Sequence, residues 1–195
     1  MSLFRVLMAC CLIGCLTACA APAAPHAIPG ESAQPSSDPR PTPASSNGPA
    51  RNLPRPQLPE TAKQNTEQGF EAFTQFWFDA ITYVMETGDP RPVNEISSPS
   101  CKMCQRQVEK ANRLYEGGGW GIGPQRMVKG FKSTMVAGAD KSVAAVFLFE
   151  ELASVTYSKA GDVGIRYTGG MIGGVQAIHA RFDEGKWVAL EVGPA

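Results

Sequence analysis

This chain of 195 residues has no net excess of positive or negative charge and only two histidines. It carries 18 Lys and Arg against 18 Asp and Glu, so its formal net charge is zero. A balanced charge argues against a nucleic-acid surface and against a polybasic membrane patch. His26 and His179 are the only histidines, so a zinc site at Cys101 and Cys104 would lack a second pair of ligands. We therefore expect neither a nucleic-acid partner nor a metal.

The sequence also lacks a phosphate-binding loop. Residues 117–123 are rich in glycine, but they follow a predicted helix and precede strands, the reverse of the required order. They also lack the Gly-Lys-Ser/Thr ending. Residues 169–174 lie before a predicted strand and favour a flexible loop or a bulge. The sequence thus predicts no cofactor.

The N-terminal apolar run is too short to span a bilayer as a helix. This stretch, residues 6–16, follows a single basic residue, Arg5, and has the layout of a secretory signal. It leads into Leu-Thr-Ala-Cys at 16–19, which resembles the lipobox of bacterial lipoproteins. The resemblance implies cleavage before Cys19, acylation of its thiol and anchoring at the outer face of the membrane.

Two alternatives stay open at this end of the chain. Leu-Ile-Gly-Cys at 12–15 fits the same pattern, which makes Cys15 a second candidate for the lipid. A simple secretory signal cleaved after Ala18 or Ala20 would leave no lipid. We favour Cys19 because it leaves the longer apolar region before it and opens directly onto a linker.

Residues 19–60 contain no aromatic side chain and hold eleven of the sixteen prolines. Their larger aliphatic residues are only Ile28, Leu53 and Leu58. Such a stretch cannot bury enough apolar surface to offset its ordering entropy, so we expect a disordered spacer. The predicted organisation is a signal peptide at 1–18, a lipidated cysteine and linker at 19–60, and one domain at 61–195.

The domain opens with a pattern typical of one long amphipathic helix over residues 61–88. Its apolar side chains recur at three- and four-residue steps: Phe70, Phe73, Trp77, Ile81 and Val84. Thr61 with Gln64 fits a capping box, and Gly88 fits a stop. We expect the rest of the domain to pack against this helix.

A helical turn near 93–96 and a second helix from Ser100 to Tyr115 follow in the prediction, with Ser100 as the cap. The later pattern predicts strands at 126–136, 142–149, 155–157, 163–167, 175–182 and 187–192. Residues 142–149 are apolar almost throughout, which predicts a strand covered on both faces. Helices first and hairpin-linked strands afterwards indicate an α+β fold, with both helices on a curved antiparallel sheet.

The aromatic helix, the Thr-Gly-Asp-Pro at 87–90 and a helix opening with Cys-x-x-Cys resemble a family of actinobacterial lipoproteins of unknown function. The element order is also similar to the nuclear-transport-factor-2-like, or cystatin-like, cone, in which a bent sheet wraps a long helix. The likeness covers residues 61–192. It implies an extracytoplasmic scaffold and supplies no catalytic residues.

Cys101 and Cys104 form the sharpest local motif. In an oxidising, exported setting a structural disulfide is the favoured interpretation. The alternative is a redox-active dithiol, because a helix N-terminus stabilises a thiolate. A thioredoxin-like site needs a preceding buried strand, whereas a loop precedes Cys101.

Asp79, Tyr83 and His179 are the candidate pocket residues, although an Asp on a long helix and a lone His on a strand both usually face water. We assign no catalytic residue. The leading hypothesis is a membrane-anchored, non-catalytic domain that binds an envelope protein or a small ligand. The alternatives are a small-molecule enzyme of the ketosteroid-isomerase-like type and a thiol-disulfide protein.

Overall fold

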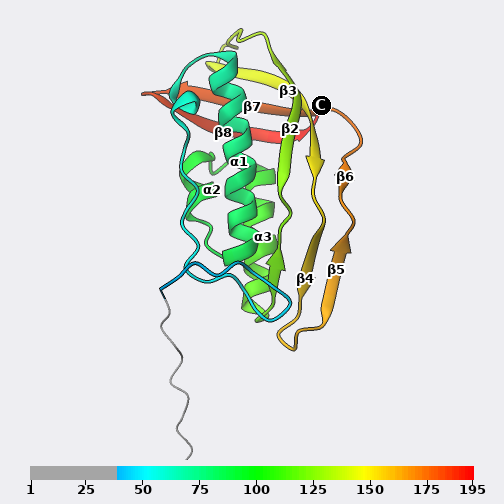
Figure 1. Cartoon of the computed structure of the whole chain (residues 1–195). Coiled ribbons are helices and arrows are strands. Elements are labelled where there is room, and N and C mark those ends of the chain that lie inside the picture. The colour runs from blue at the N-terminus through cyan, green and yellow to red at the C-terminus, as the bar shows by residue number, and fades with distance from the viewer. Residues whose placement is uncertain (1–38) are drawn as a thin grey trace, which may run out of the picture. The chain divides into compact units, whose positions relative to one another are not determined.

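The structure, a computed structural model, describes residues 39–195 (Figure 1). The lipidation sites predicted at Cys15 and Cys19 lie outside this range. The helices are α1 (Glu67–Thr87), α2 (Arg91–Ile96) and α3 (Lys102–Glu116). The strands are β1 (Trp120–Ile122), β2 (Arg126–Ser133), β3 (Ser142–Glu151), β4 (Ser154–Tyr157), β5 (Val163–Tyr167), β6 (Gly170–Met171), β7 (Gln176–Asp183) and β8 (Lys186–Pro194).

Helix α1 begins at Glu67, six residues after the predicted cap at Thr61. The hydroxyl of Thr66 caps it by accepting from Gly69 N at 3.0 Å, and Glu60–Lys63 form a separate 3₁₀ helix. The chain turns back so closely over the first turn that a Cβ at Gly69 would collide with the carbonyl of Gln64. Helix α1 ends where the sequence predicts, because Gly88 after it takes the left-handed conformation with φ 75°.

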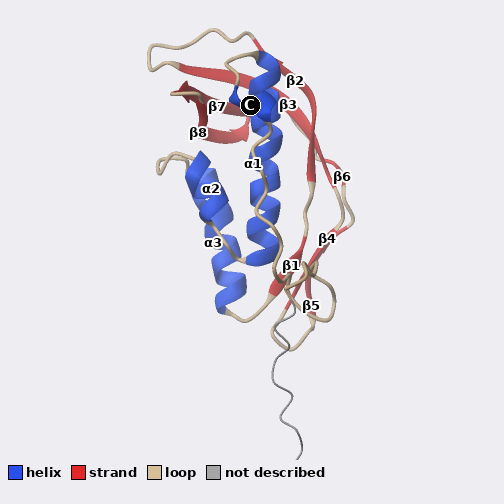
Figure 2. Ribbon diagram, turned by 60° about the vertical axis from the view of Figure 1, so that its left-hand side comes forward, coloured by secondary structure: helices blue, strands red, loops and turns tan. Residues whose placement is uncertain are grey.

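All strand pairs are antiparallel, which confirms the predicted α+β class. One sheet has the order β2-β3-β7-β8, with β6 paired to β3, and the other has the order β1-β4-β5. Strand β1 was not predicted, since three residues beginning with Trp-Gly carry no periodic signal. Figure 2 shows α1 between the pair α2 and α3 and strand β2.

The core is built from the apolar stripe of α1 and the inner face of the larger sheet. Each of the five stripe residues is at most 2% exposed, which confirms the predicted face: Phe70, Phe73, Trp77, Ile81 and Val84. Phe70 stacks on Trp187 of β8 with centroids 4.6 Å apart and meets Phe131 of β2 edge-on at 5.3 Å. Such aromatic pairs add to the free energy that burial of their area supplies.

Strand β3 is covered on one face only, so the prediction of two covered faces is wrong. Val143, Ala145 and Phe147 point into the core, whereas Val146 and Leu148 are 42% and 38% exposed. The strand is central, with β2 on one side and β7 and β6 on the other. Its outer face simply has no covering layer among the described residues, and apolar composition alone does not reveal that.

Residues 39–60, assigned to the linker from the sequence, lie against the domain in the structure. Thr42 and Arg51 pair through backbone hydrogen bonds of 2.8 Å in both directions. Trp120 Nε1 donates to Ser45 O at 2.8 Å, and Arg55 forms an ion pair with Glu95 at 3.0 Å. Proline-rich sequence predicts extended backbone, which this segment has, but extended backbone can still dock on a folded surface.

Candidate functional site

A cleft of about 460 Å³ lies between α1, the start of β2 and the extended N-terminal segment. Helix α1 contributes one face through Gln75, Asp79, Tyr83 and Glu86, whose spacing of four, four and three residues places them in a row. Thr82 of the same helix also lines the cleft, and the other walls are Leu53, Pro54, Pro56, Gln125, Arg126 and Met127. The volume lies within the range of pockets that hold small ligands.

Gln75 fixes one side of this cleft by binding the backbone edge of β2. Its Nε2 donates to Arg126 O at 2.8 Å, and its Oε1 accepts from Val128 N at 2.9 Å. These are the groups that a neighbouring strand would pair with, so the side-chain amide takes the place of a strand. The same Nε2 also donates to Asp79 Oδ1 at 2.9 Å.

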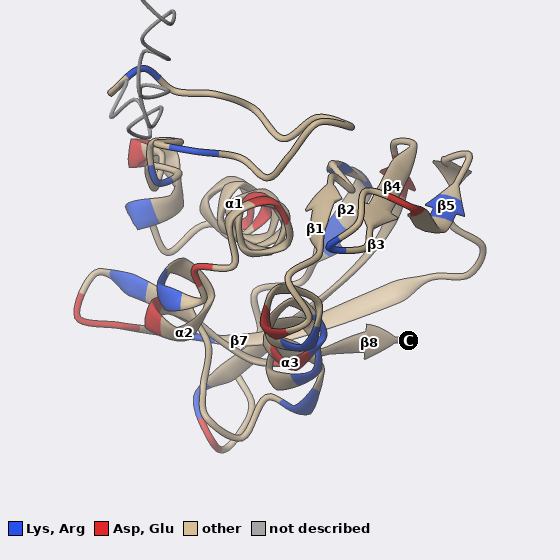
Figure 3. Cartoon of the chain, turned by 90° about the horizontal axis from the view of Figure 1, so that it is seen from below, with Lys and Arg blue, Asp and Glu red and all other residues tan. Residues whose placement is uncertain are grey.

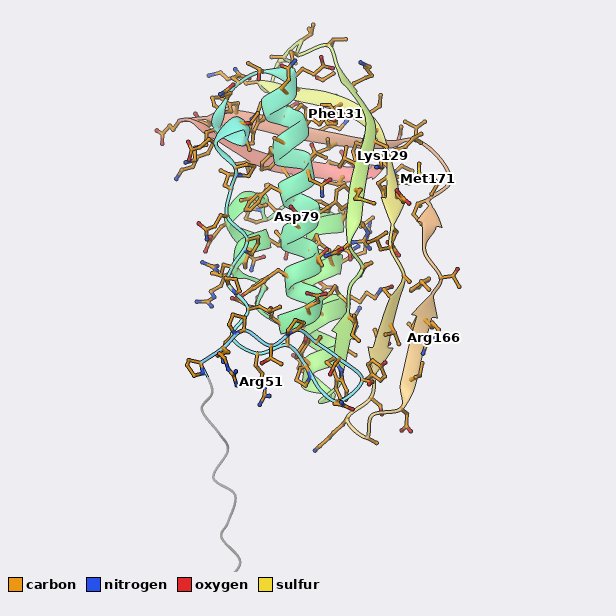
Figure 4. All side chains as sticks on the ribbon, in the orientation of Figure 1. Arg51, Asp79, Lys129, Phe131, Arg166 and Met171 are labelled. Carbon is orange, nitrogen blue, oxygen red and sulfur yellow. A yellow bond between two sulfur atoms is a disulfide. The ribbon has the colours of Figure 1, made fainter. Side chains whose placement is uncertain are left out.

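Asp79 lies near the middle of α1 and makes no ion pair among residues 39–195 (Figure 4). Desolvation by its surroundings raises the pKa of this carboxyl, and the hydrogen bond from Gln75 offsets part of that rise. Tyr83 follows one helical turn later at the same wall. Asp79 and Tyr83 therefore line the same wall of the cleft.

Arg126, one wall residue of the cleft, forms a nearly buried ion pair with Glu151, which does not itself line the cleft. Arg126 Nε donates to Glu151 Oε2 at 2.8 Å, and the side chains are 14% and 12% exposed. The guanidinium also lies 5.9 Å from the ring centroids of Phe78 and Phe149. With its charge already satisfied by a carboxylate and two rings, Arg126 shapes the cleft more than it attracts anions.

His179 is not part of this site. It lies on β7 opposite Ala144 and Glu191, on the exposed outer face of the sheet. The structure thus brings Asp79 and Tyr83 together and separates His179 from both. Strand alternation puts His179 on the face opposite its buried neighbours Ile178 and Ala180.

Nine of the eleven wall residues were not predicted from the sequence, among them Gln75, Glu86, Arg126 and Met127. Gln75 and Glu86 share a helical row with Asp79 and Tyr83, and that row could have been read as a polar stripe. Arg126 and Met127 meet the cleft only through the packing of β2 on α1, for which one sequence gives no signal. The same holds for the pairing of Arg126 with Glu151.

The space inside the helices and the larger sheet is filled by aromatic rings. Phe78 contacts Trp77, Phe147 and Phe149 with centroid distances of 5.1, 5.8 and 5.3 Å. A cavity of about 90 Å³ remains beside these rings. Pockets for small ligands occupy about 300–1,000 Å³, so this cavity is too small for most metabolites.

Cys101 and Cys104, the pair predicted as a structural disulfide, are bonded in the structure. Cys101 is also the N-cap of α3, where its Sγ accepts from Cys104 N at 3.3 Å, so the predicted cap at Ser100 is wrong. Both cysteines are fully buried. Burial keeps soluble thiols away from the sulfur atoms, which argues for a structural role.

Metal-binding clusters and membrane-spanning helices are both absent from residues 39–195. No group of three or more His, Cys, Asp or Glu lies close enough together there to hold a metal ion. Within the same range, no helix has both the length and the apolar character needed to cross a bilayer.

Residues 40–193 match the family model described as "Family of unknown function (DUF6318)". The chain belongs to this family. No curated protein matches the chain. A similar solved structure is the crystal structure of the intermembrane space region of chloroplast protein ARC6, at 9% identity and a TM-score of 0.49. That likeness covers 67% of this chain and 98% of the other.

The DUF6318 match begins at residue 40, well before helix α1. The family's domain therefore includes the extended segment that contributes Leu53, Pro54 and Pro56 to the cleft. This agrees with the contacts that the segment makes to Trp120 and Glu95.

Proposed function

We propose that this DUF6318 chain is an extracytoplasmic lipoprotein, held at the outer face of the membrane by a lipid on Cys19, whose domain binds rather than catalyses. Its ligand is a small molecule or an envelope peptide that enters the cleft beside Asp79 and Tyr83. The observation that carries the proposal is the contrast in volume between this cleft, about 460 Å³, and the aromatic-filled interior, about 90 Å³.

The chemistry of the cleft favours a ligand with an apolar body and a donor group. Leu53, Pro54, Pro56 and Met127 supply apolar walls, and Asp79 supplies an acceptor without a cationic partner in the described chain. Few polar groups set in mainly apolar walls are typical of ligand pockets. The walls that α1 and β2 supply are kept in place by the hydrogen bonds from Gln75 to the backbone of β2.

The scaffold belongs to the same proposal. Helices α1 to α3 precede an antiparallel sheet, and α1 lies against the sheet's inner face. This order supports a relationship to the nuclear-transport-factor-2-like cone and to the actinobacterial lipoproteins that the sequence resembles. A lipidated cysteine in front of residue 39 would tether such a cone outside the cell.

The cleft is tested by a fragment screen of the protein with ligand-observed NMR. Gln125 is exposed at the rim, so Gln125→Trp should fill the cleft and reduce binding of the hits by tenfold or more. Lys129→Trp, at an exposed position of β2 that does not line the cleft, is the matched control. Hits that bind the Gln125→Trp protein as well as the wild type would rule out this site.

The lipid anchor is tested by Cys19→Ala. We expect the variant to move from the membrane fraction to the medium, because the thiol that carries the acyl chains is gone. Cys15→Ala is the control and should remain in the membrane. Retention of the Cys19→Ala protein together with release of the Cys15→Ala protein would move the lipid to Cys15.

An enzyme of the ketosteroid-isomerase-like type is the second candidate, and the raised pKa of Asp79 beside Tyr83 is the observation in its favour. A carboxyl with a raised pKa is suited to proton transfer near neutral pH. Isomerisation of a 3-keto steroid that is lost in both Asp79→Asn and Tyr83→Phe would establish it. Such activity would replace the binding proposal.

A further inference from the structure

Among residues 39–195, the exposed large apolar side chains are concentrated in one stretch of the sequence. Nine of the ten lie between residues 146 and 175: Val146, Leu148, Leu152, Val163, Ile165, Tyr167, Met171, Ile172 and Val175. The tenth is Val136, in the loop before β3. Single exposed apolar residues are ordinary, whereas a contiguous apolar patch marks an interaction surface, and Val163, Ile165 and Tyr167 share one face of strand β5.

Strand β5 is the part of this region with the most open backbone. It ends the order β1-β4-β5 and pairs with β4 alone. Figure 3 shows β5 at the side of this sheet that lies away from α1. All five of its residues are exposed, and Val163, Ile165 and Tyr167 are each 50% exposed. One edge of β5 therefore has neither a strand nor a helix beside it in the described chain.

The edge of β2 shows how this protein covers an edge that is not used. There, Gln75 binds Arg126 O and Val128 N, and Glu67 Oε1 accepts from Ser133 N at 2.9 Å. Natural edge strands are otherwise protected by lysine, proline or inward-pointing charge. The sequence Val-Gly-Ile-Arg-Tyr of β5 has no lysine and no proline, and its only charge is Arg166.

We propose that β5 is the contact edge of a symmetric dimer, in which it pairs antiparallel with β5 of a second copy about a two-fold axis at Ile165. Residues whose numbers sum to 330 then lie opposite each other. Val163 faces Tyr167 of the second copy, and Gly164 faces Arg166 of the second copy. The two smaller sheets thereby join into one sheet that runs through both molecules.

This register is self-complementary in shape. Val163, Ile165 and Tyr167 alternate along one face of the strand, so the pairing lines up six apolar side chains across the two-fold axis. Arg166 meets a glycine, which leaves room for its long side chain. An interface of this kind uses the same patch on both copies, as closed dimers do.

The register is self-complementary in charge as well, and this favours a second copy over an unrelated strand. Arg166 makes no ion pair among residues 39–195. In the dimer it lies diagonally across from Asp162 of the second copy, which follows the turn before β5. The carboxylate of Asp162 accepts only from the Ser158 hydroxyl, at 3.2 Å. Diagonal cross-strand neighbours are within reach of long side chains.

The contact is small, and that decides how it should be measured. A pair of five-residue strands buries less than the ~1,200 Å² of a stable interface, so we expect a weak, concentration-dependent dimer. Cysteine cross-linking traps such a contact. In the proposed register Ile165 faces itself, so Ile165→Cys should give a disulfide-linked dimer on treatment with copper phenanthroline. The parent for this experiment is the purified full chain with serine at positions 10, 11, 15 and 19, which leaves only the bonded pair Cys101 and Cys104.

Leu148→Cys is the matched control, since Leu148 is 38% exposed but lies on the outer face of β3. We expect at least tenfold less dimer from it and none from the parent chain. Val163→Cys alone should cross-link poorly, but it should cross-link when mixed with Tyr167→Cys. That pattern distinguishes the proposed register from a slipped one.

Charge reversal gives an independent readout by light scattering. Arg166→Glu and Asp162→Lys should each raise the dimer dissociation constant about tenfold, and the double variant should recover most of the loss. Both positions are exposed, so the fold should persist, and circular dichroism checks this.

Three results would overturn the proposal. The first is a monomer at every concentration with no dimer cross-linked through Ile165→Cys. The second is equal cross-linking through Leu148→Cys, which would show contact through the whole outer face. The third is a photo-cross-linker at position 165 that labels another envelope protein in cells and never a second copy.

Discussion

The two sheets of this domain differ in what covers them. The larger sheet, β2-β3-β7-β8, packs the rings of Phe131, Phe147 and Trp187 against the apolar face of α1. The smaller sheet, β1-β4-β5, buries Trp120 and Tyr157 at its inner end but leaves every residue of β5 exposed. Figure 1 shows β2, β4 and β5 to the right of α1, with β5 at the outside, while β7 and β8 cross behind the helix.

The contrast separates the parts of the chain that stabilise the fold from those available for contact. Burial of apolar side chains dominates the folding free energy, and most residues of the buried core belong to α1 or to the larger sheet. The β5 strand contributes little to the core and costs little to alter. Elements with few buried contacts are also the ones that open first in native proteins.

The largest expected effect on stability comes from a substitution in the core between α1 and the larger sheet. Trp77 is 2% exposed, and its Nε1 donates to Ser97 Oγ at 3.1 Å. Trp77→Ala should lower the free energy of unfolding by about 3–5 kcal/mol, because it removes a large buried ring and leaves a cavity. Urea denaturation measures this.

Tyr167→Ala in β5 is the matched control for Trp77→Ala, since it also removes an aromatic ring. It should cost less than about 1 kcal/mol, because Tyr167 is half exposed before unfolding. If both variants lost a similar amount of unfolding free energy, the core around Trp77 and strand β5 would contribute equally to stability.

Loss of the disulfide should have the second largest effect on the free energy of unfolding. Replacing both Cys101 and Cys104 by alanine should cost about 2 kcal/mol, since the loop that the bond closes is short and removes little unfolded-state entropy. Because both sulfur atoms are buried, maleimide should not label Cys101 or Cys104 of the native protein after mild reduction. Rapid labelling would instead favour the thiol-disulfide alternative.

A smaller loss of stability is expected at the edge of β2 that Gln75 covers. Gln75→Ala removes the partners of Arg126 O and Val128 N, so it should cost about 1.5 kcal/mol and speed amide exchange at Val128. Glu71→Ala, on the exposed side of the same helix, is the control. Unchanged exchange at Val128 would show that the amide does not protect this edge.

Much of the fold could be predicted because its signals are local. The three- and four-residue spacing of Phe70 to Val84 fixes the buried face of α1, and Gly88 fixes its end. The start of the helix depends on a close approach between Gly69 and Gln64, which no propensity describes. The apolar run in β3 reports composition but not the number of covering layers, so Val146 and Leu148 were placed wrongly.

The site could be predicted only where one element supplies it. Asp79 and Tyr83 share a helical row, so their common wall follows from spacing alone. Arg126 and Glu151 meet through the pairing of β2 with β3, and Leu53 to Pro56 reach the cleft through docking of an extended segment. Both depend on contacts between residues distant in sequence. The exposed side of His179 likewise depends on the strand register.

The smallest expected effect concerns Asp79, at the boundary between the covered edge and open solvent. Because desolvation raises the pKa of its carboxyl in the folded state, the folded protein binds that proton more tightly than the unfolded chain does. The contribution of Asp79 to stability is therefore most favourable at low pH and declines as the pH rises through the raised pKa. Asp79→Asn removes this decline, so the variant should gain a few tenths of a kcal/mol over the wild type between pH 3 and pH 7.

Urea denaturation across that range measures the gain, with Glu71→Gln as a variant of the same helix that should change stability less. A direct carboxyl titration by NMR gives the sign independently, and a value for Asp79 below the ordinary aspartate pKa of about 3.9 would contradict the account of this cleft as a desolvating surface.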